Sequence, residues 1–131
     1  MAERAILIVD DHDVLRKLLE TNLHEWFADV RVLDVADGEA AVDLALRERP
    51  DAVIMDITLP GMNGIEATRL IKKQLPDTPV VILSVHELTA YQEDAAAAGA
   101  DAYVPKRLMQ TELCQVLDRL LNGEPACARH E

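Results

Sequence analysis

Five polar residues directly follow short apolar runs, and their types together suggest phosphoryl chemistry at a metal site. They are Asp10, Asp11, Asp56, Ser84 and Lys106. A ligand set made only of oxygen atoms, with no His or Cys among the ligands, favours a hard cation, Mg²⁺ rather than Zn²⁺. A lysine and a hydroxyl can neutralise and bind phosphoryl oxygens, and a carboxylate can accept the phosphoryl group itself.

The apolar pattern predicts a fold that brings these residues to one edge. Short apolar runs predict strands over 5–9, 30–35, 52–55, 79–83 and 102–104. Five strand–helix repeats favour an α/β, doubly wound (βα)5 sandwich, with a parallel sheet between two layers of helices. In the flavodoxin-like order 2-1-3-4-5 the first and third strands are neighbours. Asp10, Asp11 and Asp56 should therefore crowd together at the carboxyl ends of the strands.

Segments of helical spacing separate the predicted strands. Asp37 and Asn63 are good N-caps for the second and third helices, and Gly99 suits the end of the fourth. The fifth helix is expected over 109–121. In the first helix one apolar stripe is predicted, made up of Val14, Leu15, Leu18, Leu19, Leu23 and Trp26.

Length and charge limit the class of protein. The 131 residues suit one domain, and 13 basic against 24 acidic residues give a net charge of −11. Such an acid excess argues against a nucleic-acid or anionic-membrane binder, because phosphates would be repelled. Two cysteines make neither a disulfide framework nor a zinc site. The sequence lacks a signal peptide and a membrane-length apolar run, so we expect a cytoplasmic protein.

The motifs together resemble the response-regulator receiver domain of two-component signalling (CheY-like) over about residues 4–121. They are Ile-Val-Asp10-Asp11-His, Val-Ile-Met-Asp56-Ile-Thr-Leu-Pro-Gly-Met-Asn-Gly, Val-Ile-Leu-Ser84 and Gly-Ala-Asp-Ala-Tyr103-Val-Pro-Lys106. The resemblance implies that Asp56 is the phosphoacceptor. It also implies that Mg²⁺ is held by Asp10, Asp11, Asp56 and the backbone carbonyl of Thr58.

The resemblance also implies the switch and the partners. Ser84 and Lys106 would bind phosphoryl oxygens, and Tyr103 would be the aromatic residue that moves with Ser84. The phosphodonor would be a histidine kinase or a phosphotransfer protein, and the domain would catalyse only its own phosphorylation and dephosphorylation. The signal would leave through the face of helix 4, strand 5 and helix 5, with homodimerisation on phosphorylation as a further expectation.

Details of the motifs are most similar to NarL/FixJ-type regulators, which carry a DNA-binding output domain after the receiver. We therefore expect a receiver domain at 1–121 and a linker or tail at 122–131, with transcription as the output and no direct nucleic-acid binding by these residues. Lys106 is followed by Arg107, where many receivers have proline, which implies either a trans or a strained cis bond. Val85 is bulkier than the usual Ala or Gly, so we hypothesise slow self-dephosphorylation.

Other interpretations remain open at this point. A haloacid-dehalogenase-type phosphatase also uses an aspartyl phosphate, and the stretch from Asp11 to Asp13 superficially fits its motif. A non-catalytic module, either flavodoxin-like or a degenerate receiver, is the second alternative. Taken singly, Lys106 could be a surface lysine, Tyr103 could be core packing, and His12 and His86 could be solvated loop residues at the rim of the site.

Overall fold

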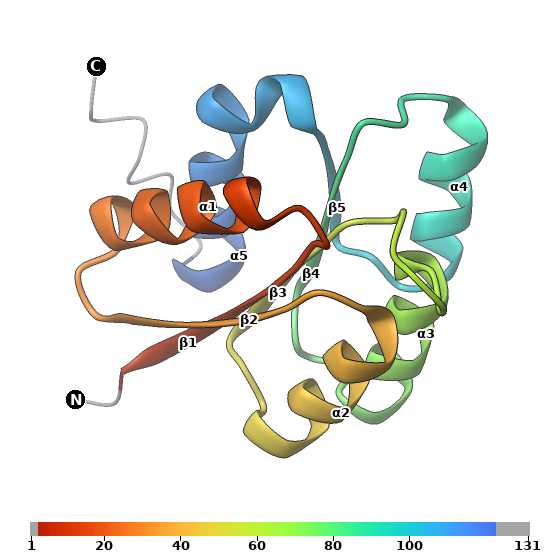
Figure 1. Ribbon diagram of the computed structural model, residues 1–131, viewed down its shortest axis with the longest axis horizontal. Coiled ribbons are helices and arrows are strands. Elements are labelled where there is room, and N and C mark those ends of the chain that lie inside the picture. The colour runs from red at the N-terminus through yellow and green to blue at the C-terminus, as the bar shows by residue number, and fades with distance from the viewer. Residues whose placement is uncertain (1–2, 123–131) are drawn as a thin grey trace.

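The computed structural model describes residues 3–122 and contains a five-stranded parallel sheet in the order β2-β1-β3-β4-β5 (Figure 1). The strands are β1 (Arg4–Val9), β2 (Val30–Val35), β3 (Ala52–Met55), β4 (Val80–Ser84) and β5 (Ala102–Pro105). The predicted doubly wound fold and strand order are confirmed. The three central strands are buried along nearly their whole length, which explains their continuous apolar runs.

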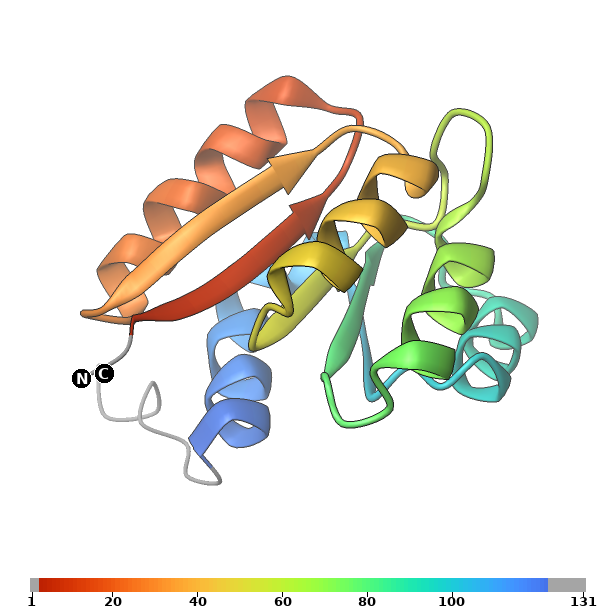
Figure 2. The ribbon, with the colours of Figure 1, turned by 90° about the horizontal axis from the view of Figure 1, so that it is seen from below.

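Helices cover both faces of the sheet, as Figure 2 shows. They are α1 (Asp13–Trp26), α2 (Gly38–Glu48), α3 (Gly64–Gln74), α4 (Thr89–Ala97) and α5 (Cys114–Asn122). One core lies under α1 and α5, where Leu19, Leu23 and Leu117 are fully buried against the sheet. The other lies under α2, α3 and α4. Both faces of the sheet are therefore buried under helices, and the strand ends lie at the edge between the two layers.

Side-chain caps begin three of the helices, and two of them were predicted. The Asp37 carboxylate accepts a hydrogen bond from the Ala40 N–H at 2.7 Å, and the Asn63 side chain accepts one from Glu66 N–H at 2.9 Å. His12 caps α1, since its Nδ1 accepts from the Leu15 N–H at 3.2 Å. His12 is therefore an exposed helix cap rather than a merely solvated loop residue.

The predicted apolar stripe of α1 is wrong at two positions. Val14 and Leu18 are 72% and 43% exposed, whereas Leu19, Asn22 and Leu23 are buried. Positions 14 and 18 lie one helical turn apart on the flank of the helix, so they share a face that turns away from the sheet. The buried stripe is thus narrower than the apolar pattern suggested, and it includes a polar residue.

The segment after β5 is also less regular than predicted. Instead of one helix from about Met109, a 3-10 turn (Lys106–Leu108) and a π-helical turn (Met109–Leu113) precede α5. No cis peptide bond occurs in residues 3–122, so the bond after Lys106 is trans. The linker or tail predicted at 122–131 lies outside the described residues, except for Asn122 at the end of α5. Within 3–122 no helix has the length and apolar character needed to cross a membrane.

Candidate functional site

Three carboxylates meet where β1 and β3 end. Val9 and Met55 pair in the sheet, and the Asp56 N–H donates to the Val9 carbonyl at 2.9 Å, so the residues after the two strands are adjacent. Oxygen atoms of Asp10, Asp11 and Asp56 lie within 4.8 Å of one another. Asp10 and Asp56 are buried and Asp11 is exposed. The predicted crowding of these acids is confirmed.

Lys106 enters the same site from the end of β5. Its Nζ lies 2.9 Å from Asp10 Oδ2 and 3.3 Å from Asp56 Oδ2, and its side chain is 19% exposed. It is therefore a partly buried cation between two carboxylates, not a surface lysine. Lys106 thus pairs with both of the buried carboxylates in the cluster.

Burial dominates the electrostatics of Asp56. Desolvation raises the pKa of this carboxyl, the charge of Lys106 opposes the rise, and the charge of Asp10 adds to it. For Lys106 burial lowers the pKa, but the hydrogen bond to Asp10 and the charge of Asp56 outweigh it, so the ammonium pKa is raised. Lys106 therefore stays protonated, while Asp56 is a carboxylate in an unfavourable environment that a further cation would relieve.

The donor set fits a hard divalent cation. Asp10, Asp11 and Asp56 offer only oxygen, and within residues 3–122 they form the sole cluster of three or more candidate metal-ligating side chains. Mg²⁺ prefers such oxygen ligands and usually keeps several waters. The Thr58 carbonyl, expected as a further ligand, stays a prediction. Thr58 is exposed, and its N–H helps to lower the pKa of Asp56 by hydrogen bonding.

Gly64 permits the close approach of α3 to the phosphoacceptor candidate. A Cβ at this position would lie 1.8 Å from the Asp56 carbonyl oxygen, and the Gly64 N–H donates to the Ile57 carbonyl at 2.8 Å. Any side chain here would displace the backbone that carries Asp56. The glycine of the Met-Asn-Gly motif is thus explained by packing at the site.

His86 holds the loop after β4 against the site, although the sequence alone suggested a solvated loop residue at this position. The buried Ser84 Oγ accepts from the His86 N–H at 3.0 Å, and the Tyr103 hydroxyl donates to the His86 carbonyl at 2.6 Å. The His86 Nε2 lies 2.9 Å from Thr58 Oγ1, and its ring stacks on Tyr91 at 4.3 Å. Ser84 and Tyr103, both predicted switch residues, therefore meet through the backbone of His86. The only sequence signal was its place two residues after Ser84.

An ion pair between Arg107 and Glu87 is a second contact that holds this loop. Arg107 Nε and Nη2 each lie 2.8 Å from a Glu87 oxygen, and both side chains are exposed. Arg107 stands where many receivers have proline. The sequence therefore singled out position 107 as unusual, but it did not predict the ion pair with Glu87. Val85, between Ser84 and His86, is 65% exposed.

Comparison with known proteins identifies the family. The model of the response regulator receiver domain matches residues 6–118. The response regulator GacA of Pseudomonas aeruginosa is 36% identical over 123 residues, which are 91% of this chain and 56% of that protein. The transcriptional regulatory protein DegU of Brevibacillus brevis is 34% identical over 118 residues, 90% of this chain and 50% of its own. The chain spans about half the length of these curated relatives.

Solved structures agree with the sequence matches. A two-component response regulator of the LuxR family from Aurantimonas superposes with a TM-score of 0.86 at 33% identity, covering 98% of this chain and 94% of that one. A second structure is the receiver domain of the sensor histidine kinase PA1611 from Pseudomonas aeruginosa, which was solved with magnesium coordinated in its active-site cleft. It superposes with a TM-score of 0.82 at 35% identity, covering 94% of this chain and 100% of that one. The family match excludes the dehalogenase-type alternative: this chain belongs to the response regulator receiver domain family.

Proposed function

We propose that this chain accepts a phosphoryl group on Asp56 from a histidine kinase or a phosphotransfer protein, in a Mg²⁺-dependent reaction. One observation carries the proposal: the carboxylate of Asp56 lies beside those of Asp10 and Asp11 and in contact with Lys106. That arrangement joins a nucleophile, a cation site and a fixed positive charge. Receiver domains are signalling domains, and we infer that this one catalyses only its own phosphorylation and dephosphorylation.

In the proposed transfer an oxygen of Asp56 forms a bond to phosphorus as the phosphorus–nitrogen bond of a phosphohistidine breaks. The imidazole leaves with the bonding electron pair, and the product is an acyl phosphate on Asp56. Asp56 must attack in its ionised form. Burial raises the pKa of Asp56, so its ionised form is less stabilised by its surroundings than a solvated carboxylate.

Three groups would stabilise the transferred phosphoryl group. Mg²⁺, when bound, supplies Lewis-acid neutralisation of phosphoryl charge, and Asp10, Asp11, Asp56 and the Thr58 carbonyl would hold it. Lys106 would turn from Asp10 to the phosphoryl oxygens, since its ammonium is already within 3.3 Å of Asp56. The Ser84 hydroxyl, whose oxygen accepts from the His86 N–H, would donate a further hydrogen bond to a phosphoryl oxygen.

A movement of Ser84 would provide the switch. If Ser84 moves toward the phosphoryl group, its bond to the His86 N–H is lost, and the Tyr103 hydroxyl bonds the same residue's carbonyl. The loop from Ser84 to Leu88 and the ring of Tyr103 therefore move together. A useful shift of population needs a few kcal/mol of coupling, which the new contacts of Lys106 and Ser84 to phosphate would provide.

The output we propose is transcription, through a DNA-binding domain beyond residue 131. It is supported by the names of the relatives, one of them a transcriptional regulatory protein of about twice this length. The face of α4, β5 and α5 would transmit the signal, with homodimerisation on phosphorylation. With a net charge of −11 these residues would not bind DNA themselves. The chain would act in the cytoplasm, where a kinase and DNA are both accessible.

Incubation with phosphoramidate or acetyl phosphate and Mg²⁺, followed by intact-protein mass spectrometry, tests the proposal. We expect a gain of one phosphoryl group, which disappears in Asp56→Asn. The control is Asp51→Asn, since Asp51 precedes β3 at the opposite end of the sheet and should not affect the gain. A gain that persists in Asp56→Asn, or no gain in the unmodified chain, would refute the proposal and favour a degenerate receiver.

A further inference from the structure

Arg16, in the second turn of α1, reaches back to the turn that carries two of the candidate metal ligands. Its Nη1 donates to the backbone carbonyl of Asp10 at 2.6 Å, and its Nη2 donates to Asp13 Oδ1 at 2.5 Å. Its Nε lies 3.7 Å from Asp34 Oδ2 on β2. The side chain is only 18% exposed. A partly buried guanidinium thus ties α1, β2 and the end of β1 together.

The contact with the Asp10 carbonyl is the informative one. That oxygen belongs to the planar peptide group that joins Asp10 to Asp11, so fixing it restricts the backbone directions of both residues. The same turn is fixed at two other points: the Asp10 N–H donates to the Val35 carbonyl at 3.2 Å, and Asp10 Oδ1 accepts from the His12 N–H at 2.8 Å. Those two bonds involve the peptide groups on either side of the Asp10–Asp11 peptide, and Arg16 binds the carbonyl of that peptide itself.

We propose that Arg16 is a positioning residue for the cation site: it holds the Asp10–Asp11 peptide so that both carboxylates face the site before a cation binds. This inference rests on the proposed function, because it requires that the acid cluster binds Mg²⁺. Groups that orient metal ligands through hydrogen bonds typically contribute ten- to hundredfold to metal affinity. The guanidinium suits this role because it bonds two oxygens at once in a fixed geometry.

Simple electrostatics predicts the opposite result, and this makes the inference testable. Arg16 is a positive charge near the acid cluster, so its removal should by charge alone strengthen the binding of a cation. A purely structural role, tying α1 to β2, would lower the stability of the fold and leave Mg²⁺ affinity unchanged. Only a positioning role predicts weaker Mg²⁺ binding when a nearby positive charge is removed.

The experiment is isothermal titration of the full chain with MgCl₂ at constant ionic strength. We expect Arg16→Gln to weaken Mg²⁺ binding by roughly ten- to hundredfold. Arg16→Lys should weaken it by a smaller factor although the charge is kept, because an ammonium lacks the planar fork. The matched control is Arg47→Gln, which removes an exposed arginine paired with Asp43 on α2 and should change the affinity by less than twofold.

Urea unfolding without Mg²⁺, run on each variant, separates folding from positioning. If Arg16→Gln does not fold, Arg16→Lys decides the question, since it preserves the charge beside Asp13 and Asp34. Unchanged or tighter Mg²⁺ binding in a folded Arg16 variant would overturn this inference alone. Absence of Mg²⁺ binding in the unmodified chain would overturn the metal site of the proposed function and this inference with it.

Discussion

Aspartates stand at both ends of the sheet, but their surroundings differ. At the amino end, Asp51 precedes β3 and Asp101 precedes β5. The N–H of Asp51 donates to the Ala5 carbonyl at 2.7 Å, and its carboxylate accepts from the Ala5 N–H at 2.8 Å. Asp101 repeats the pattern with Val80, at 2.8 Å in both directions, and also binds Lys72 at 2.9 Å. Each of these acids extends the ladder of hydrogen bonds between neighbouring strands.

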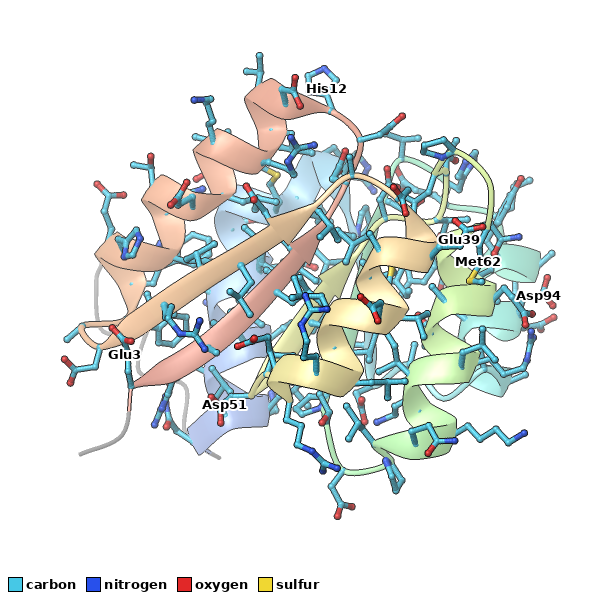
Figure 3. All side chains as sticks on the ribbon, turned by 60° about the horizontal axis from the view of Figure 1, so that its bottom comes forward. Glu3, His12, Glu39, Asp51, Met62 and Asp94 are labelled. Carbon is cyan, nitrogen blue, oxygen red and sulfur yellow. The ribbon has the colours of Figure 1, made fainter. Side chains whose placement is uncertain are left out.

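At the carboxyl end the acids face one another instead. Oxygen atoms of Asp10, Asp11 and Asp56 lie within 4.8 Å of one another, and Lys106 contacts those of Asp10 and Asp56. Figure 3 places His12, next to Asp11, and Asp51 at opposite ends of the sheet. An aspartate carboxylate therefore stabilises the fold where it accepts a hydrogen bond from a backbone N–H. Where it lies beside other carboxylates, it requires a cation. Substitutions at the two ends should separate stability from chemistry.

The largest stability effect should come from the amino end. Asp101→Ala leaves the N–H of the buried Val80 and the ammonium of Lys72 without this carboxylate, so we expect a loss of about 2 kcal/mol in the free energy of unfolding. Phosphorylation of Asp56 should be retained. Urea unfolding and the phosphoryl mass gain measure the two effects. Asp94→Ala, an exposed position on α4 labelled in Figure 3, is the control and should leave stability nearly unchanged.

The positions of these aspartates were predictable only in part. The carboxyl-end acids follow apolar runs, and a parallel sheet brings the ends of its neighbouring strands together, so the sequence was enough to place Asp10, Asp11 and Asp56. The bonds of Asp51 and Asp101 depend on the register between strands distant in the chain, which the apolar pattern does not encode. Both aspartates precede strands, and that position alone is also common for turn residues.

The loop after β4 shows the same limit. Ser84 and Tyr103 were predicted from motifs, whereas His86 joins Thr58, Tyr91 and the Tyr103 hydroxyl through contacts that depend on how two loops, α4 and β5 meet. In α1 the apolar pattern overestimated the buried face, because it could not show how far the helix turns toward the sheet. Local patterns thus predicted the elements and the meeting of strand ends, and failed where contacts depend on the orientation of a helix or on the path of a loop.

At the carboxyl end, loss of an acid should stabilise the fold. Because burial raises the pKa of Asp56, its ionised form is less favourable in the folded chain than in the unfolded one. Stability should therefore fall as the pH rises from the ordinary carboxyl pKa, roughly 3.9, through the raised value. Without Mg²⁺, Asp56→Asn should be more stable than the unmodified chain at neutral pH, and the difference should shrink toward pH ~4. Urea unfolding at both pH values checks this. An Asn variant less stable at neutral pH would contradict it.

Lys106 gives the next effect, opposite in sign to that of Arg16. Its ammonium bonds the Asp10 and Asp56 oxygens that a metal ion would need, so it competes with Mg²⁺. In Lys106→Met we expect Mg²⁺ to bind about tenfold more tightly, a change of about 1.4 kcal/mol, because both the competitor and its charge are lost. Calorimetric titration measures this affinity, and Lys17→Met, an exposed lysine of α1, is the charge-matched control. Weaker binding would show that Lys106 organises the acids rather than competing for them.

The smallest effect concerns access of water to the carboxyl end. Val85 is 65% exposed and directly follows Ser84, for which we propose a contact with the phosphoryl group, so we expect the Val85 side chain to border that group. In Val85→Ala the smaller side chain should admit the attacking water more readily and speed hydrolysis roughly threefold, a change of about 0.6 kcal/mol in the barrier. Loss of phosphoryl mass with time, after removal of the donor, gives the rate. Leu88→Ala makes a similar apolar truncation at the far end of the same loop, where the side chain is 70% exposed, and should leave the rate unchanged. If both variants hydrolyse at the rate of the unmodified chain, the lifetime of the acyl phosphate is set by the charged groups of this end rather than by the apolar side chain at its rim.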